Sequence, residues 1–136
     1  MYRNILVAID IAAPERARRI ISRAKQLLDE GGTIVLLTVV EELPEYIISE
    51  IPPDFSAAAH RDTEARLLQL RERNGVTAEI EVRHGGPARE ILAAAEARNV
   101  DLVILASHRP DLSNYFLGAT ADRVVRHAQC SVLVDR

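Results

Sequence analysis

The sequence predicts an α/β protein with an open five-stranded parallel sheet, in the strand order 3-2-1-4-5, and helices on both faces, a three-layer sandwich. Strand-like and helix-like segments alternate strictly along the chain, which is typical of parallel sheets with helical crossovers. Two short runs, 5–9 and 102–106, are apolar throughout, so they belong in the middle of the sheet. The run 77–83 alternates apolar and charged residues, which places it at an edge.

The first quarter of the chain predicts a strand, a helix and a second strand. The run 5–9 is too short for a comfortable helix and is rich in β-branched residues. Apolar residues then recur at helical spacing, Pro14 suits the first helical turn, and Gly31-Gly32 suits the end of the helix. Residues 33–40 are again almost continuously apolar and predict the second strand.

Residues 41–56 interrupt this pattern with adjacent acidic residues and three prolines. We expect an irregular connection there, and a connection of this length in a small domain is often functional. A helix is expected over roughly 57–73, with Ala65, Leu67 and Leu68 facing inward, before the edge strand at 77–83.

The second half predicts two further helices and two further strands. Gly85-Gly86-Pro87 opens a helix that leads to the buried strand 102–106, and a loop over 107–117 follows. Gly118 begins a short helix, and the last strand is expected over 131–134. The residues expected to face inward from this helix are Ala121, Val124, Val125 and Ala128.

Composition narrows the function classes. The chain has 136 residues, 27% of them charged, and a net charge of −3, which suits one globular domain and disfavours a nucleic-acid partner. The single Cys130 excludes an intramolecular disulfide and a cysteine-only zinc site. No run is long enough to span a membrane, and the N-terminus leads directly into a strand, so we expect a cytoplasmic protein.

The predicted topology places a switch point between the first and fourth strands, where open α/β sheets bind ligands. Asp10 and the loop that starts at Ser107 follow those two strands. A carboxylate at the position of Asp10 can accept both hydroxyls of a ribose. The alternative is an aspartate that caps the following helix.

The segment 106–120 leaves a buried strand and ends at a helix start, whose N–H groups and dipole favour an anion. Ser107 and Thr120 add hydroxyls, Arg109 adds a guanidinium suited to phosphate, and Gly118 allows close backbone approach. The alternative is a plain loop with a helix cap. His108 could contact a phosphate or bond to the backbone. The four histidines have no metal-ligand spacing, so no metal site is expected, and no catalytic residue is assigned.

Five stretches together resemble the universal stress protein (UspA) family over essentially the whole chain. The loop Ser107-His108-Arg109-Pro110-Asp111 resembles an enterobacterial-type branch of that family. The resemblance implies a single universal-stress-protein domain over 1–136. The matching stretches are 5–10, 37–40, 85–92, 104–118 and 125–134.

The family resemblance also implies an adenine-nucleotide site for ATP or AMP, with magnesium accompanying ATP. The motif Gly-x2-Gly-x9-Gly-Ser/Thr maps onto Ala106, Arg109, Gly118 and Ala119, with one residue fewer before Gly118 and Thr120 beside Ala119. The resemblance implies that Asp10 holds the ribose and that Ala8 stands where many members have proline. It places the backbone of Val39 or Val40 at the adenine, and Gly85 and Gly86 at the pocket rim. The residues it places around the phosphates are Ser107, His108, Arg109, Gly118, Ala119 and Thr120.

These observations favour an adenine-nucleotide-binding regulatory protein of the stress response, in which any hydrolysis is slow and incidental. The alternative is a nucleotide-free dimeric interaction module of the same fold, which the altered glycine motif favours. A third possibility is an ATPase or phosphotransferase, but the sequence shows no P-loop lysine to support it. The apolar last strand predicts a homodimer through the sheet edge, which could assemble into a tetramer, and the family resemblance implies the same interface.

Overall fold

The computed structural model describes residues 1–41, 46, 50, 53–107 and 118–136, with only the backbone described at 53–56. The elements are β1 (Tyr2–Ala8), α1 (Pro14–Leu27), β2 (Leu28–Val40), α3 (Pro53–Arg73), β3 (Glu79–His84), α4 (Pro87–Ala97), β4 (Leu102–Ala106), α5 (Ala119–His127) and β5 (Ser131–Asp135).

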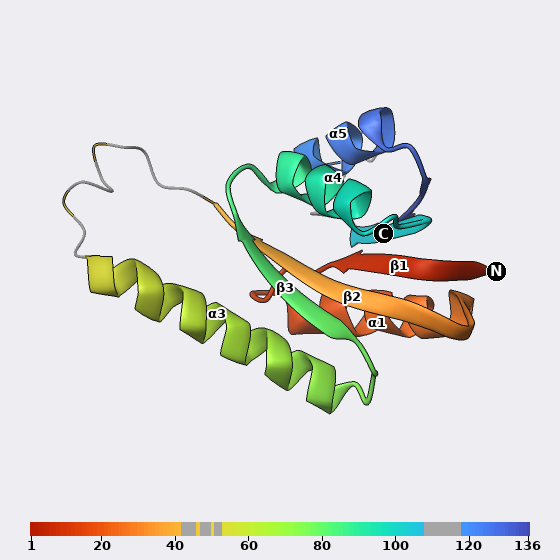
Figure 1. Ribbon diagram of the computed structural model, residues 1–136, viewed down its shortest axis with the longest axis horizontal. Coiled ribbons are helices and arrows are strands. Elements are labelled where there is room, and N and C mark those ends of the chain that lie inside the picture. Colours follow the sequence, from red (N-terminus) through yellow and green to blue (C-terminus); the bar gives the residue numbers. More distant parts are fainter. Residues whose placement is uncertain (42–45, 47–49, 51–52, 108–117) are drawn as a thin grey trace.

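The five strands form one parallel sheet in the order β3-β2-β1-β4-β5. Helices α1 and α3 cover one face, and α4 and α5 cover the other (Figure 1). The predicted fold class and strand order are therefore confirmed.

The core has two halves, one on each face of the sheet. Alternate residues of β1 supply both halves, because successive strand side chains point to opposite faces. Ile5 and Val7 pack with α1 and α3, whereas Leu6 packs with α4 and α5. Both faces of the central strands are thus covered, which is why their sequences are apolar throughout.

Gly31 and Gly32 lie within β2, so the prediction that they end a helix is wrong. Helix α1 ends at Leu27, and the pairing of β1 with β2 shifts register between Tyr2 and Asn4. Gly32 sits where a Cβ would approach the Arg3 carbonyl oxygen to 2.7 Å. The glycine pair therefore allows a bulge in β2 to pass close to β1.

Helix α3 begins at Pro53, earlier than predicted, because a proline is well tolerated in the first helical turn. Its buried stripe consists of Thr63, Leu67 and Leu70, and Ala65 is exposed, contrary to the prediction. Steps of three and four residues place the stripe on one helix face, and position 65 falls outside it.

The charged face of β3 forms an ion-pair network, which agrees with its predicted edge position. Arg83 and Arg98 donate to opposite oxygens of Glu81, each at 2.7 Å, and Arg83 also donates to Glu90 at 2.9 Å. Burial tends to raise the pKa of Glu81, but the hydrogen bonds and charges of the two arginines hold that pKa below its ordinary value. The network links the edge strand to α4 and to the residue that follows it.

Helix α5 buries Ala121 and Val124, whereas Val125 is 44% exposed. The prediction that Val125 faces inward is therefore wrong. Adjacent helical residues point about 100° apart, and this short helix has a narrow buried stripe.

We expect Val124→Ala to lower the free energy of unfolding by about 2 kcal/mol, because it leaves a cavity in the core half under α5. Val125→Ala is the matched control, and its effect should stay below about 0.5 kcal/mol. Urea denaturation followed by circular dichroism measures both values. Equal losses would contradict the packing described for α5.

Asp101 joins the starts of β1 and β4. Its two carboxylate oxygens accept the backbone N–H groups of Arg3 and Asn4, each at 2.9 Å. Burial tends to raise the pKa of Asp101, but these backbone hydrogen bonds, with the N-terminal charge, lower it below the ordinary 3.8. The charged carboxylate therefore contributes stability at pH values above its ordinary pKa of 3.8. This contribution is lost as the pH falls through the lower pKa of the folded state.

Asp101→Asn should lower the free energy of unfolding by ~1 kcal/mol at neutral pH, since the amide offers one acceptor where two are used. The difference from wild type should shrink as the pH falls below about 4. Denaturation between pH 3 and 7, with the exposed Asp62→Asn as control, tests this. A difference that is constant over the range would rule out the stabilising role of the carboxylate charge.

Candidate functional site at the sheet switch point

A cleft opens where β1 and β4 separate at their carboxyl ends. The two strands pair only through Ile5–Leu102, Leu6–Val103 and Val7–Ile104, although β1 continues to pair with β2 to Ala8. Beyond these pairs lies a cleft of about 620 Å³. This is the topological switch point that the strand order predicted.

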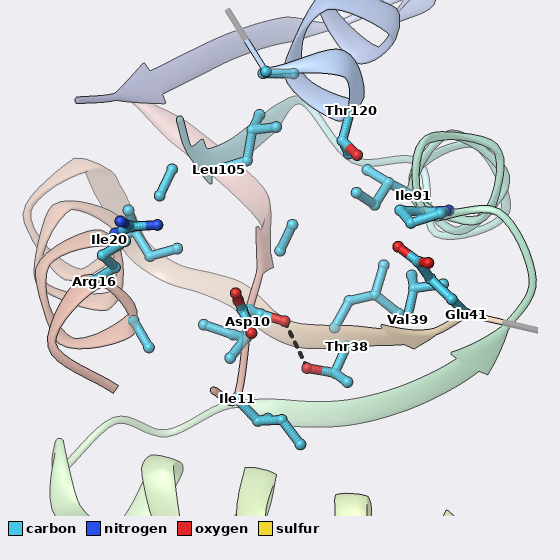
Figure 2. A pocket seen from close by; sticks show the side chains of 18 of the residues that line it. Asp10, Ile11, Arg16, Ile20, Thr38, Val39, Glu41, Ile91, Leu105 and Thr120 are labelled. Atoms are coloured by element: carbon cyan, nitrogen blue, oxygen red, sulfur yellow. Dashed lines mark hydrogen bonds between the residues drawn. The ribbon is translucent and has the colours of Figure 1, made fainter. Parts of the chain in front are cut away.

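Seven chain segments line the cleft (Figure 2). The carboxyl ends of the strands supply its floor, and helices supply its walls. The lining residues are 8–11, Arg16, Ala17, Ile20, 37–41, Thr63, Pro87, Ile91, Leu105, Ala106 and 118–121.

Asp10 lies at the cleft just beyond β1, with an exposed side chain. Its Oδ1 accepts the Ala12 N–H at 2.9 Å, and its carbonyl accepts the Ala13 N–H at 3.0 Å. Residue 13, not Asp10, occupies the N-cap position of α1. Asp10 thus forms an Asx turn ahead of the helix, which fixes the direction of its carboxylate.

The end of β2 presents the backbone of Val39 to the cleft. Leu37 accepts the Ile9 N–H at 2.7 Å, so its carbonyl faces β1, whereas the Val40 carbonyl accepts the Gly85 N–H at 3.0 Å and faces β3. Backbone groups of successive strand residues alternate in direction. Those of Val39 therefore point to the side where β1 has ended.

The first turn of α5 forms the opposite wall of the cleft. Gly118 is the N-cap residue and makes no side-chain cap hydrogen bond. Ala119 and Thr120 follow it at the cleft, and Figure 2 shows Thr120 across the cleft from Asp10. N–H groups in the first turn of a helix lack intrahelical acceptors, so they favour an anionic group.

The structure brings most of the sequence-predicted site residues together. Those that line the cleft are Ala8, Asp10, Val39, Val40, Gly118, Ala119 and Thr120. Gly85, Gly86 and Ser107 do not line it, although Pro87 does. His108 and Arg109 lie outside the described residues.

Backbone hydrogen bonds explain the positions of Ser107 and Gly85. The Ser107 N–H donates to the Asp135 carbonyl at 2.8 Å, which continues the pairing of β4 with β5 rather than turning to the cleft. Gly85 has a φ of 140°, and its N–H donates to the Val40 carbonyl. Both residues therefore continue the strand pairing at the carboxyl ends of the sheet, next to the cleft.

Sequence reasoning missed four polar residues of the lining: Arg16, Thr38, Glu41 and Thr63. Thr38 and Thr63 are buried, and Glu41 lies between Val39 and Ile91 in Figure 2. Among the described lining residues, the charged side chains are those of Asp10, Arg16 and Glu41. The lining therefore combines an apolar floor with a few polar groups, as small-molecule sites usually do.

The described residues hold neither a cluster of metal-ligand side chains nor a membrane-spanning helix. No group of three or more His, Cys, Asp or Glu side chains is placed to hold a metal ion. None of the helices in the described parts of the chain is long and apolar enough to cross a membrane.

A sequence model of the Universal stress protein family matches residues 1–136. The chain belongs to this family. Among curated relatives, universal stress protein G of Escherichia coli O157:H7 is 28% identical over the full length of both chains. Universal stress protein Sll1388 of Synechocystis is also 28% identical, over 98% of this chain and 97% of its own.

Solved structures share the fold. The hypothetical protein MJ0577 superposes with a TM-score of 0.80 at 23% identity, covering 99% of this chain and 96% of its own. The hypothetical protein PH0823 gives 0.75 at 29% identity, with the same coverage. A universal stress protein in complex with cAMP gives 0.64 at 20% identity, covering 99% and 97%.

Proposed function

We propose that this universal stress protein binds an adenine nucleotide, AMP or ATP, in the switch-point cleft and acts as a regulatory protein of the stress response. The observation that carries the proposal is the convergence of Asp10, the Val39 backbone and the α5 N-terminus on one cleft. The complex of a fellow family member with cAMP, which is itself an adenine nucleotide, supports this ligand class.

In this proposal, each part of the cleft holds one part of the nucleotide. Adenine lies at the end of β2, where the Val39 N–H donates to a ring nitrogen and the Val39 carbonyl accepts from the exocyclic amine. The ribose lies over β1, where Asp10 accepts its hydroxyls. The phosphates lie at Ala119 and Thr120, where the helix N-terminus favours negative charge.

The proposal is binding rather than phosphoryl transfer. A P-loop enzyme uses a lysine against the phosphates. Lys25, the only lysine in the sequence, donates instead to the Asn74 carbonyl at 3.2 Å, and it does not line the cleft.

Asp10→Asn should weaken AMP binding about tenfold, which corresponds to ~1.4 kcal/mol for the loss of a charged acceptor. The amide oxygen can still accept the Ala12 N–H, so the Asx turn is kept. Isothermal titration calorimetry measures the affinity, with Asp62→Asn as an exposed control. Unchanged affinity in Asp10→Asn would remove Asp10 from the ribose site.

Ala106, at the place of the first motif glycine, favours the alternative of a nucleotide-free interaction module. Native mass spectrometry of freshly purified protein separates the two functions, because a copurified nucleotide adds its mass directly. If AMP, ATP and cAMP all fail to bind the wild-type protein at millimolar concentration, the nucleotide-free function is the correct one.

We also propose a homodimer through β5. This strand lies at the sheet edge, and its residues Val132, Leu133 and Val134 are apolar and only partly buried. An unpaired apolar edge strand invites pairing with another strand. A twofold antiparallel pairing of two β5 strands satisfies the backbone groups of both.

Light scattering at micromolar concentration should give the dimer mass for wild type. Leu133→Asp should shift it toward the monomer, because the substitution places a charge at the pairing edge. Circular dichroism checks that the variant is folded, since Leu133 also packs against the core. A monomer mass for wild type would be decisive against the β5 interface.

A further inference from the structure

Thr38 places a buried hydroxyl group in the otherwise apolar stretch 34–40 of β2. Its side chain is 4% exposed, and its Oγ1 donates to the Ile9 carbonyl at 2.7 Å (Figure 2). The hydrogen bond runs from β2 to the residue that follows β1. It therefore joins two neighbouring segments of the sheet at the point where the regular pairing of β1 with β2 stops.

With this hydrogen bond, both the N–H and the carbonyl of Ile9 have partners on β2. The Ile9 N–H already donates to the Leu37 carbonyl at 2.7 Å, and Thr38 binds the carbonyl of the same residue. Both backbone polar groups of Ile9 are thus held by adjacent residues of β2. The Ile9 carbonyl belongs to the peptide that carries Asp10, so its orientation sets where the Asp10 side chain begins.

We propose that Thr38 is a positioning residue, which aims the Asp10 carboxylate into the cleft by holding the Ile9 carbonyl. The inference rests on the proposed function, because it assigns Thr38 to the ribose-binding part of that site. Thr38 does not touch the ribose in this scheme. It acts through Asp10, which the Asx turn with Ala12 then fixes from the other side.

Replacement chemistry distinguishes this role from simple packing. Valine has almost the shape of threonine but no donor, so Thr38→Val leaves the buried Ile9 carbonyl without its partner. Serine keeps the hydroxyl and loses a methyl group, so Thr38→Ser keeps the hydrogen bond at a cost in packing. Thr33, an exposed threonine of the same strand, provides the matched control Thr33→Val.

The first readout is AMP affinity by calorimetry. Thr38→Val should bind AMP about tenfold more weakly, whereas Thr38→Ser and Thr33→Val should stay within about threefold of wild type. Both Thr38 variants should melt at a lower temperature than wild type. If Thr38 had only a structural role, AMP affinity would fall in step with the melting temperature in both variants. If Thr38 positions Asp10, affinity should fall only in Thr38→Val, which lacks the hydroxyl group.

The second readout needs no ligand. Amide hydrogen exchange of Ala12, measured by NMR, reports the Asx turn of Asp10 directly. We expect exchange about tenfold faster in Thr38→Val and near wild type in Thr38→Ser and Thr33→Val. If Thr38→Val does not fold, Thr38→Ala replaces it, since the smaller side chain leaves room for water at the Ile9 carbonyl.

The two readouts separate the failure of each proposal. Unchanged Ala12 exchange in Thr38→Val overturns the positioning role, whatever the affinity. A wild-type protein that binds no AMP, but shows the expected exchange pattern, overturns the nucleotide proposal and leaves the control of Asp10 by Thr38 in place. Equal loss of affinity in Thr38→Val and Thr38→Ser also overturns the positioning role.

Discussion

The separation of β1 from β4 after three paired residues is the constraint on which the cleft depends. Helices α1 and α3 lie on one face of the sheet and α4 and α5 on the other, so the crossovers from these two strands run to opposite sides. No crossover among the described elements therefore covers the gap between them. The backbone of Ile9, just after β1, still bonds to Leu37 and Thr38 on β2, so this end of the chain stays with β2 where the pairing of β1 with β4 has stopped.

The fold was largely predictable because burial on both faces leaves a clear sequence signature. The runs at 5–9 and 102–106 are apolar without alternation, and the central strands β1 and β4 include most of them. The prediction failed where the same sequence pattern is typical of two different structures. A Gly-Gly pair after a helical pattern resembles a helix end, but here Gly32 serves a bulge packed against Arg3.

Part of the site was predictable from topology alone. Asp10 and Gly118 follow strands or precede helices at the switch point, so strand order brings them together without knowledge of side-chain contacts. Thr38 and Thr63 were missed because a hydroxyl within an apolar run or on a helix face carries no signal of its partner. Their role depends on which carbonyl or cavity lies opposite, and that is set by packing.

The two edges of the sheet differ in character, and the difference limits how far the sheet can extend. Arg83 and Glu81 stand on β3 within a network of fixed ion pairs, whereas β5 carries Val132, Leu133 and Val134. A strand added at β3 would have to pack beside these charges and disturb their pairing. In the dimer proposed through β5, each copy would present its charged β3 edge outward. Pairing of that kind would stop at two copies, because neither outward edge invites a further strand.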